Sequence, residues 1–354
     1  MKLLVQPDHG LAPLVAALKG ARKTIEIVIF RFDRREIEAA LKAAVERRVI
    51  VRALIAHTNR DGEKSLRKLE ARFLEGGVIV ARTADDLARY HGKMMIIDGR
   101  VLYVLSFNLV HVDIDESRCF GIVTRNAKLV QEARKLFEAD AARQLYMPGL
   151  NTFLVSPLNA RKELAAFLRK ARKQLLIYDP QIADPQMIHL LQERLKAGVE
   201  VRIIGHVAKR SGSLRAATLP TIRLHTRTII RDRHQAFVGS QGLRTPELSS
   251  RREIGVIVRD PKVVNSLLAV FERDWASTAL AKEQNAAPAL DAGALAKELQ
   301  PLAHTVRQAV KKAVANADGE ALADGEVKAT VKKAVKKAVK EAMKEAVQEK
   351  QESN

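Results

Sequence analysis

The sequence predicts an α/β protein made of two duplicated halves and an α-helical C-terminal tail. Two observations indicate the duplication: an apolar run after Ala-Arg-Lys recurs 150 positions later, and a pattern of histidine, basic residue, aspartate and serine recurs 134 positions later. A third is the change of composition to Ala, Lys, Glu and Val after the second copy. We therefore expect a first half over residues 1–148, a second half over residues 149–280 and a tail over residues 281–354.

Each half begins with the pattern of a strand, a helix and a second strand. In the first half the β-branched run IEIVIF precedes the stretch IEAALKAAVERR and then VIVR at 49–52. In the second half LLIYD precedes MIHLLQERLKAG and then VEVR at 199–202. Two apolar runs flanking an amphipathic segment with a 3.6-residue period are typical of a βαβ unit with parallel strands. We expect these two halves to pack about a pseudo-twofold axis.

The first half also carries an insertion. Between the two blocks of similarity the second half is sixteen residues shorter, and the extra part of the first half lies within residues 58–90. This part includes the charged stretch NRDGEKSLRKLEARF, which we interpret as a helix with a loop near the duplicated site. A lid or substrate-selecting element and a merely longer connection are both open interpretations.

The Pro148-Gly149 turn marks the border between the halves, and the second half ends near Trp275. In the tail, the similar stretches 306–319 and 327–342 predict two helices joined by a Gly-containing connection. Two interpretations of the tail are open. It is either a basic amphipathic helix that lies on nucleic acid or an anionic membrane, or a solvated helical or self-associating appendage.

The charge of the chain predicts polyanionic partners. Lys and Arg number 61 against 41 Asp and Glu, a net charge of +20, of which the tail holds only +2 and residues 1–280 hold +18. Such a field attracts nucleic acid or an anionic phospholipid surface. The length of 354 residues and the 47% hydrophobic content exclude a disordered or disulfide-stapled protein.

The sequence also favours a reducing compartment. Cys119 is the only cysteine, so an intrachain disulfide is excluded. The first ten residues do not have the pattern of a signal peptide, and no eighteen apolar residues run together. We expect a cytoplasmic protein that can also lie peripherally at the inner membrane face.

The first candidate motif gathers polar side chains on a predicted β-hairpin. His91-Gly-Lys93, MMII and Asp98 spell HxKxxxxD, and the turn at Asp98 precedes a second apolar run. His91 and Lys93, two residues apart in a strand, share one face. The returning strand delivers Ser106 and Asn108, again on one face. The hairpin thus collects an imidazole, an ammonium, a hydroxyl and an amide, all of which suit a phosphate.

The second motif repeats this arrangement with His225, Arg227, Asp232 and Ser240. Two such hairpins facing one another across a pseudo-twofold axis would put two imidazoles in one pocket. The paired pattern resembles the phospholipase D superfamily, whose signature is a duplicated HxKxxxxD followed by GSxN. The resemblance covers roughly residues 10 to 275 and leaves the tail unexplained.

The resemblance implies a two-step phosphodiester transfer that needs no metal and no cofactor. His91 would attack phosphorus to give a phosphohistidine, and His225 would protonate the departing oxygen and then activate water or an alcohol. Because one imidazole must be neutral and the other protonated, activity should follow a bell-shaped pH curve. No zinc-protease, zinc-ribbon or P-loop motif competes with this interpretation.

The remaining motif residues have supporting roles by the same resemblance. Lys93 and Arg227 would hold the anionic oxygens, and the hydroxyls and amide would donate hydrogen bonds to them. These donors are Ser106, Asn108 and Ser240. By strand parity the motif aspartates lie on the far side and orient the hairpins, and one glutamate would orient a histidine. These carboxylates are Asp98, Asp232 and Glu253.

Three departures from the signature weaken the second copy or its partner. Arg227 stands where the pattern has lysine, Leu105 replaces the glycine of GSxN in the first copy, and Gly242 replaces the asparagine of the second. Cys119 stands where Glu253 would match, so an orienting carboxylate is expected in one half only.

We favour a phosphodiesterase or phosphatidyltransferase that acts on phospholipid. A metal-independent nuclease with the same mechanism is the first alternative, although Tyr 4 and Trp 1 offer few stacking platforms for bases. The second alternative is a catalytically weak or inactive scaffold that binds polyanions, which the three departures would explain.

Overall fold

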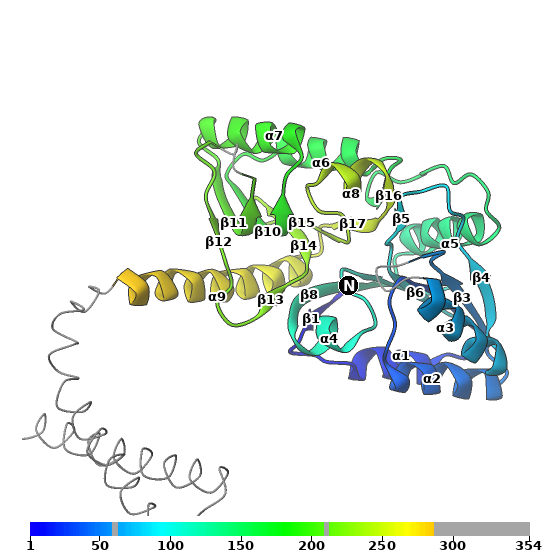
Figure 1. Cartoon of the computed structure of the whole chain (residues 1–354). Helices are drawn as coiled ribbons and strands as arrows, with labels where there is room; N and C mark the ends of the chain where they lie inside the picture. Colours follow the sequence, from blue (N-terminus) through cyan, green and yellow to red (C-terminus); the bar gives the residue numbers. More distant parts are fainter. Residues whose placement is uncertain (59–62, 209–211, 287–354) are drawn as a thin grey trace, which may run out of the picture. The chain divides into compact units, whose positions relative to one another are not determined.

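The computed structural model describes residues 1–58, 63–208 and 212–286 (Figure 1). Residues Met1–Ala281 form one compact unit, and Lys282–Asn354 form a second. The helices predicted at 306–319 and 327–342 lie outside the described residues. Among the described helices, none combines the length and the apolar character that crossing a membrane requires.

The elements of the first half follow one another around one sheet. In chain order they are β1 (Lys2–Gln6), α1 (Ala12–Gly20), β2 (Thr24–Ile29), α2 (Arg35–Glu46), β3 (Ile50–Ile55), α3 (Glu63–Glu75), β4 (Ile79–Arg82), β5 (Arg89–Tyr90), β6 (Met94–Ile97), β7 (Val101–Leu105), α4 (His111–Asp115), β8 (Ser117–Thr124) and α5 (Ala127–Ala141). The strand order is β1-β8-β7-β6-β2-β3-β4.

The second half repeats this plan. Its elements are β9 (Phe153–Val155), α6 (Ala160–Arg169), β10 (Gln174–Ile182), α7 (Pro185–Lys196), β11 (Glu200–Val207), β12 (Ala216–Ala217), β13 (Arg223–Leu224), β14 (Arg227–Arg231), β15 (Gln235–Gly239), α8 (Thr245–Ser249), β16 (Arg251–Arg252), β17 (Ile254–Val258) and α9 (Pro261–Ala286). The strand order β12-β11-β10-β14-β15-β17-β9 is that of the first sheet read in reverse.

The predicted βαβ units are confirmed in both halves. Strand β2 pairs in parallel with β3, and β10 pairs in parallel with β11. Helix α2 makes the first crossover and buries an apolar face of Ile37, Ala40, Leu41 and Ala44. The five apolar residues Ile25, Ile27, Val28, Ile29 and Leu54 of the paired strands are at most 3% exposed, which is typical of a parallel sheet covered on both faces.

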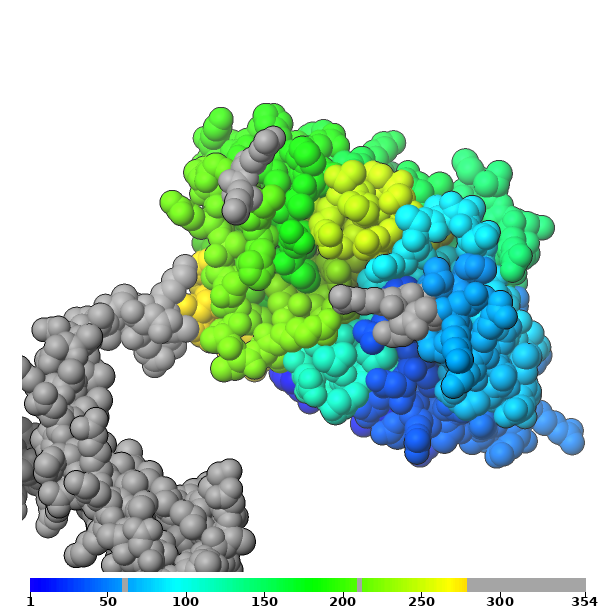
Figure 2. Space-filling model, in the orientation of Figure 1, coloured from blue at the N-terminus to red at the C-terminus, as the bar shows by residue number. Residues whose placement is uncertain are grey.

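Short strands of the two halves pair with one another. The segment before the first histidine, β5, pairs with β16 of the second half, and the segment before the second histidine, β13, pairs with β8 of the first half. In Figure 2 the cyan region around β5 lies against the yellow-green region around α8 and β16. Since each contact has a counterpart 134 positions away, the halves are related by the pseudo-twofold axis that we expected.

Helix α3 occupies the insertion of the first half, as predicted. Its residues Leu66, Leu69 and Phe73 are buried, and the Phe73 ring packs edge to face on Phe32 with 5.4 Å between centroids. The helix is therefore packed into the first half, and its role as a lid stays a prediction. Residues 59–62 lie outside the described part of the chain.

Candidate active site

The two motif hairpins are anchored by their aspartates. Asp98 and Asp232 each stand at a turn with positive φ, 52° and 50°. Both accept hydrogen bonds of 2.6–3.2 Å from three consecutive backbone N–H groups, those of Arg22, Lys23 and Thr24 for Asp98 and of Arg172, Lys173 and Gln174 for Asp232. Each carboxylate thereby ties the hairpin to the start of the neighbouring strand, β2 or β10, which pairs antiparallel with the hairpin. The histidines lie at the opposite end of the same strands.

The first imidazole is held by a carboxylate from the other half. The Nδ1 atom of His91 lies 2.8 Å from the Oε2 atom of Glu253, and the backbone N–H of His91 donates to the carbonyl of Arg252 at 2.7 Å. The ring packs edge to face on Phe30. With Nδ1 facing a carboxylate, the proton of the neutral ring belongs on Nδ1, and the lone pair of Nε2 is left for chemistry.

The second imidazole has weaker partners. The Nδ1 atom of His225 lies 3.6 Å from the sulfur of Cys119 and 3.6 Å from the Oδ2 atom of Asp113. Its backbone N–H donates to the carbonyl of Arg118 at 3.2 Å. Burial, together with the charge of Asp113, raises the pKa of the Cys119 thiol well above its usual value, so the thiol stays protonated. The backbone hydrogen bonds of the two histidines are therefore equivalent, whereas their side-chain partners differ.

Two buried ion pairs fix the arginines whose carbonyls hold the histidines. Arg118 contacts Asp274 at 2.8 Å, and Arg252 contacts Asp140 at 3.1 Å. Each pair joins one half to the other, and the two pairs are 134 positions apart. Because each arginine fixes both an ion pair and a histidine backbone, the interface between the halves positions the site.

The motif cations lie with the histidines at one site. The Nζ atom of Lys93 donates to the carbonyl of His91 at 2.7 Å, and Arg227 donates to the carbonyl of His225 at 2.8 Å. Burial first, then the charges of Lys93 and Arg227, lower the pKa of His91 well below its usual value, and burial and Arg227 do the same for His225. Burial lowers the pKa of Lys93 to about 7, which Glu253 opposes and Arg227 reinforces.

The motif serines are engaged in the sheets. The Oγ atom of Ser106 accepts a hydrogen bond from the backbone N–H of Phe120 at 2.9 Å, and that of Ser240 accepts one from Ile254 at 3.1 Å. Both residues are fully buried. In this structure the hydroxyls join adjacent strands, which is a positioning role. Their expected contact with phosphate oxygens stays a prediction.

Asn108 and its equivalent, Gly242, have different surroundings. The Nδ2 atom of Asn108 donates to Asp113 at 2.7 Å. A Cβ atom on Gly242 would lie 2.6 Å from Glu247 and 3.1 Å from Asp179, so an asparagine side chain would collide with two carboxylates. Burial, reinforced by Glu247, raises the pKa of Asp179 to about 6. The second motif therefore lacks the amide of Asn108 and has the carboxyl group of Asp179 beside the equivalent position, Gly242.

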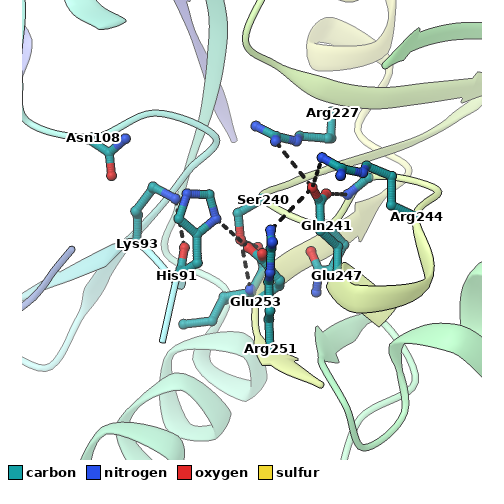
Figure 3. Close-up of polar contacts among 12 residues, drawn as sticks. His91, Lys93, Asn108, Arg227, Ser240, Gln241, Arg244, Glu247, Arg251 and Glu253 are labelled. Atoms are coloured by element: carbon teal, nitrogen blue, oxygen red, sulfur yellow. Dashed lines mark hydrogen bonds and ion pairs between the residues drawn. The ribbon is translucent and has the colours of Figure 1, made fainter. Parts of the chain in front are cut away.

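An arginine group that the sequence analysis did not predict lies beside the second motif. Arg227, Arg244 and Arg251 each lie 3.6 Å from the buried carboxylate of Glu247, on which they converge (Figure 3). Glu247 and Asp113 are 134 positions apart, so a longer search for the repeat could have found both carboxylates. Within the described residues, no cluster of three or more potential metal ligands occurs.

A family model and one characterised protein match this chain in sequence. The family described as "Cardiolipin synthase, PLD-like domain" matches residues 14–141 and 164–275. A mitochondrial cardiolipin hydrolase of Danio rerio is 28% identical over 151 residues, which are 40% of this chain and 65% of that protein. The chain therefore spans slightly less than two thirds of this relative.

Two solved structures share the fold. Polyphosphate kinase from Porphyromonas gingivalis superimposes with a TM-score of 0.65 at 19% identity, over 77% of this chain and 46% of that one. Phosphatidylserine synthase from Haemophilus influenzae Rd KW20 superimposes with a TM-score of 0.57 at 13% identity, over 78% of this chain and 85% of that one. At such identities the likeness shows the fold alone.

Proposed function

Because this chain belongs to the phospholipase D superfamily, in the family of cardiolipin synthase PLD-like domains, we propose that it transfers or hydrolyses a phosphodiester of a phospholipid. The observation that carries this proposal is the pair of buried imidazoles, each bound by backbone to the opposite half. His91 has a carboxylate on Nδ1, and both histidines lie within the fields of Lys93 and Arg227.

We assign the nucleophile to His91. Its depressed pKa keeps the ring neutral near pH 7, and Glu253 fixes the tautomer that exposes Nε2. Attack of Nε2 on phosphorus forms a P–N bond and breaks the P–O bond to the leaving alcohol. The carboxylate of Glu253 stabilises the positive charge that develops on the imidazole during this step.

We assign proton transfer to His225. In the first step it donates a proton to the departing oxygen, and in the second step it takes a proton from water or an acceptor alcohol, whose oxygen then breaks the P–N bond. Burial and Arg227 disfavour the protonated ring in the free protein. An anionic phosphodiester bound at the same place raises the pKa of His225 and so supplies the acid form when substrate is present.

Lys93 and Arg227 hold the non-bridging oxygens of the phosphate. Both cations sit against histidine carbonyls, which fixes them beside the two imidazoles. A charge pair at 4 Å attracts by about 4 kcal/mol at an effective dielectric constant of 20. Two such cations offset the repulsion between an electron-rich nucleophile and an anionic phosphodiester.

A nuclease is the second candidate function, and one observation favours it. The charge of +18 over residues 1–280 suits a polyanionic polymer as well as a membrane surface. The predicted partners are therefore an anionic phospholipid surface or nucleic acid. Binding of polyanions by the tail, or self-association of the tail, stays a prediction.

The experiment is a substrate comparison in the presence of a chelator. The purified full-length protein is incubated with labelled phosphatidylglycerol vesicles and, separately, with single-stranded and double-stranded DNA. We expect release of glycerol or a new phospholipid from the vesicles only, and complete loss of this product in His91→Gln. Turnover of DNA alone would identify the nuclease, and activity that depends on added divalent metal would overturn the mechanism.

A further inference from the structure

The arginine group beside the second motif has more positive charge than its carboxylate needs. Glu247 is fully buried, and a single guanidinium would neutralise it. Instead Arg227, Arg244 and Arg251 surround it, each at 3.6 Å and so outside ordinary hydrogen-bond distance. The three guanidinium groups share one carboxylate, and none of them is in a bidentate pair with it.

The hydrogen-bond donors of this group are largely uncommitted. In the described part of the chain, the side chains of Arg244 and Arg251 make no hydrogen bond, and the buried Nε atom of Arg227 has no partner. Each guanidinium carries five N–H donors in a planar fork that matches the oxygens of a phosphate. The guanidinium side chains of Arg244 and Arg251 remain 38% and 20% exposed, so a ligand can reach them.

The arginine group lies beside the reactive histidine. The charges of Arg227, Arg251 and Glu247 all act on the imidazole of His91. In Figure 3 the arginines approach Glu247 next to the pair formed by His91 and Glu253. A ligand group bound by these arginines would therefore be adjacent to the phosphorus atom that His91 attacks.

The group is confined to one half. At the positions 134 residues earlier, the first half has Lys93, Val110 and Ser117 in place of Arg227, Arg244 and Arg251. The repeat relates Lys93 to Arg227, and it also relates Arg89 to Arg223, which contacts Asp113 at 2.8 Å. Arg244 and Arg251 have no cationic counterpart in the first half. The carboxyl groups that face the arginines are Glu247, Asp179, which lies beside Gly242, and Glu253, whose charge interacts with Arg227 and Arg251. Glu253 also binds His91, so it is shared between the imidazole and the arginines.

We propose that Arg227, Arg244 and Arg251 bind a second phosphate group of the substrate, next to the phosphodiester that reacts. This inference rests on the proposed function and deepens it, because a phosphodiester that carries another phosphate should bind more tightly than phosphatidylglycerol, which carries one phosphate. The guanidinium of Arg227 touches both places, through the carbonyl of His225 and through Glu247, and so links the two phosphate sites. The oxygens of this phosphate would accept hydrogen bonds from the guanidinium N–H groups that Glu247 does not engage.

The first test measures binding without turnover. Full-length His91→Gln protein is titrated calorimetrically with orthophosphate, pyrophosphate and glycerol 1,3-bisphosphate. We expect at least one of the two-phosphate probes to bind roughly tenfold or more tightly than orthophosphate, as charge-assisted hydrogen bonds allow. Equal affinity for all three probes would overturn the proposal. The arm that binds more tightly shows whether the phosphates are joined directly or through glycerol.

The second test places the site on the named side chains. Arg244→Gln with Arg251→Gln, in the same background, should abolish the preference for two phosphates, whereas the matched variant Arg233→Gln should keep it. Arg233 is 60% exposed and lies at the turn of the β14–β15 hairpin, at the end away from Arg227. A preference that survives in the double variant would overturn the proposal. If the double variant does not fold, Arg244→Gln alone, whose side chain is 38% exposed, gives the same comparison.

Failure of the proposed function is measured separately. Protein with an intact His91 is assayed on bis(p-nitrophenyl) phosphate, which has one phosphate, and the control Arg233→Gln should retain this turnover. A protein that prefers two-phosphate probes yet cleaves no phosphodiester would sustain the binding site and refute the enzyme. A protein that cleaves the chromogenic ester without such a preference would do the reverse.

Discussion

Replacing Glu253 by glutamine removes one charge from the site while keeping the size of the side chain. The Nδ1 atom of His91 is 2.8 Å from the Glu253 carboxylate, which is fully buried. At this separation a full charge pair is worth about 6 kcal/mol at an effective dielectric constant of 20. If half of a unit charge develops on the imidazole in the transition state, the loss is about 3 kcal/mol, or on the order of a hundredfold in rate.

The assay is the single-turnover rate of phosphohistidine formation with excess Glu253→Gln protein over a chromogenic phosphodiester. The matched control is Cys119→Ala at the pseudo-equivalent position, where the sulfur lies 3.6 Å from His225. We expect less than about a threefold effect there, since a weak thiol contact contributes little. A Glu253→Gln rate within threefold of the parent, with an unchanged melting temperature, would refute the orienting role.

Three further predictions concern pH, the hairpin turns and the interface between halves. The value of kcat/KM should fall as the pH rises through about 7, because Lys93 loses its charge there. Lys93→Arg should move this fall to higher pH. If the fall stays at the same pH in Lys93→Arg, Lys93 is not its cause. Asp98→Ala should lower the free energy of unfolding by about 1–3 kcal/mol, since three backbone N–H groups lose their acceptor. Urea titration measures this loss, with Asp85→Ala, at an exposed position, as the control. Arg252→Met should cost about 3–5 kcal/mol, because the buried Asp140 loses its cation and keeps only the hydrogen bond from the Tyr90 hydroxyl. Arg252→Met with Asp140→Leu and Tyr90→Phe should recover much of this loss in calorimetry.

The sequence was sufficient for those features that depend on local periodicity. The βαβ units follow from apolar runs and an amphipathic segment, and the hairpins follow from turn residues between two apolar runs. The turn at Asp98 follows from its place between two apolar runs, and strand parity predicts that Asp98 and Asp232 lie on the far side from the histidines. The pseudo-twofold relation followed from the recurrence of whole blocks, because a repeated unit buries equivalent surfaces.

Other features depend on contacts that have no local signal. Strands β5 and β16 are two residues long, which is too short for an alternating pattern in the sequence to predict that they pair across the two halves. The convergence of Arg244 and Arg251 on Glu247 arises within one short loop and helix, where the sequence resembles an ordinary charged surface. Ser106 and Ser240 accept hydrogen bonds from backbone N–H groups because they lie where the pairing of two strands ends. The spacing of residues in the sequence does not predict where that pairing ends.

The most direct test of two imidazoles acting on one phosphorus is to trap the covalent intermediate. His225→Gln protein is mixed, in chelator, with a phosphodiester whose nitrophenol leaving group departs without an acid, quenched, and digested for mass spectrometry. We predict a stable phosphoryl adduct on His91, because the group that would activate water for the second step has been removed. An adduct that never forms, or one found elsewhere on the chain, would contradict this mechanism.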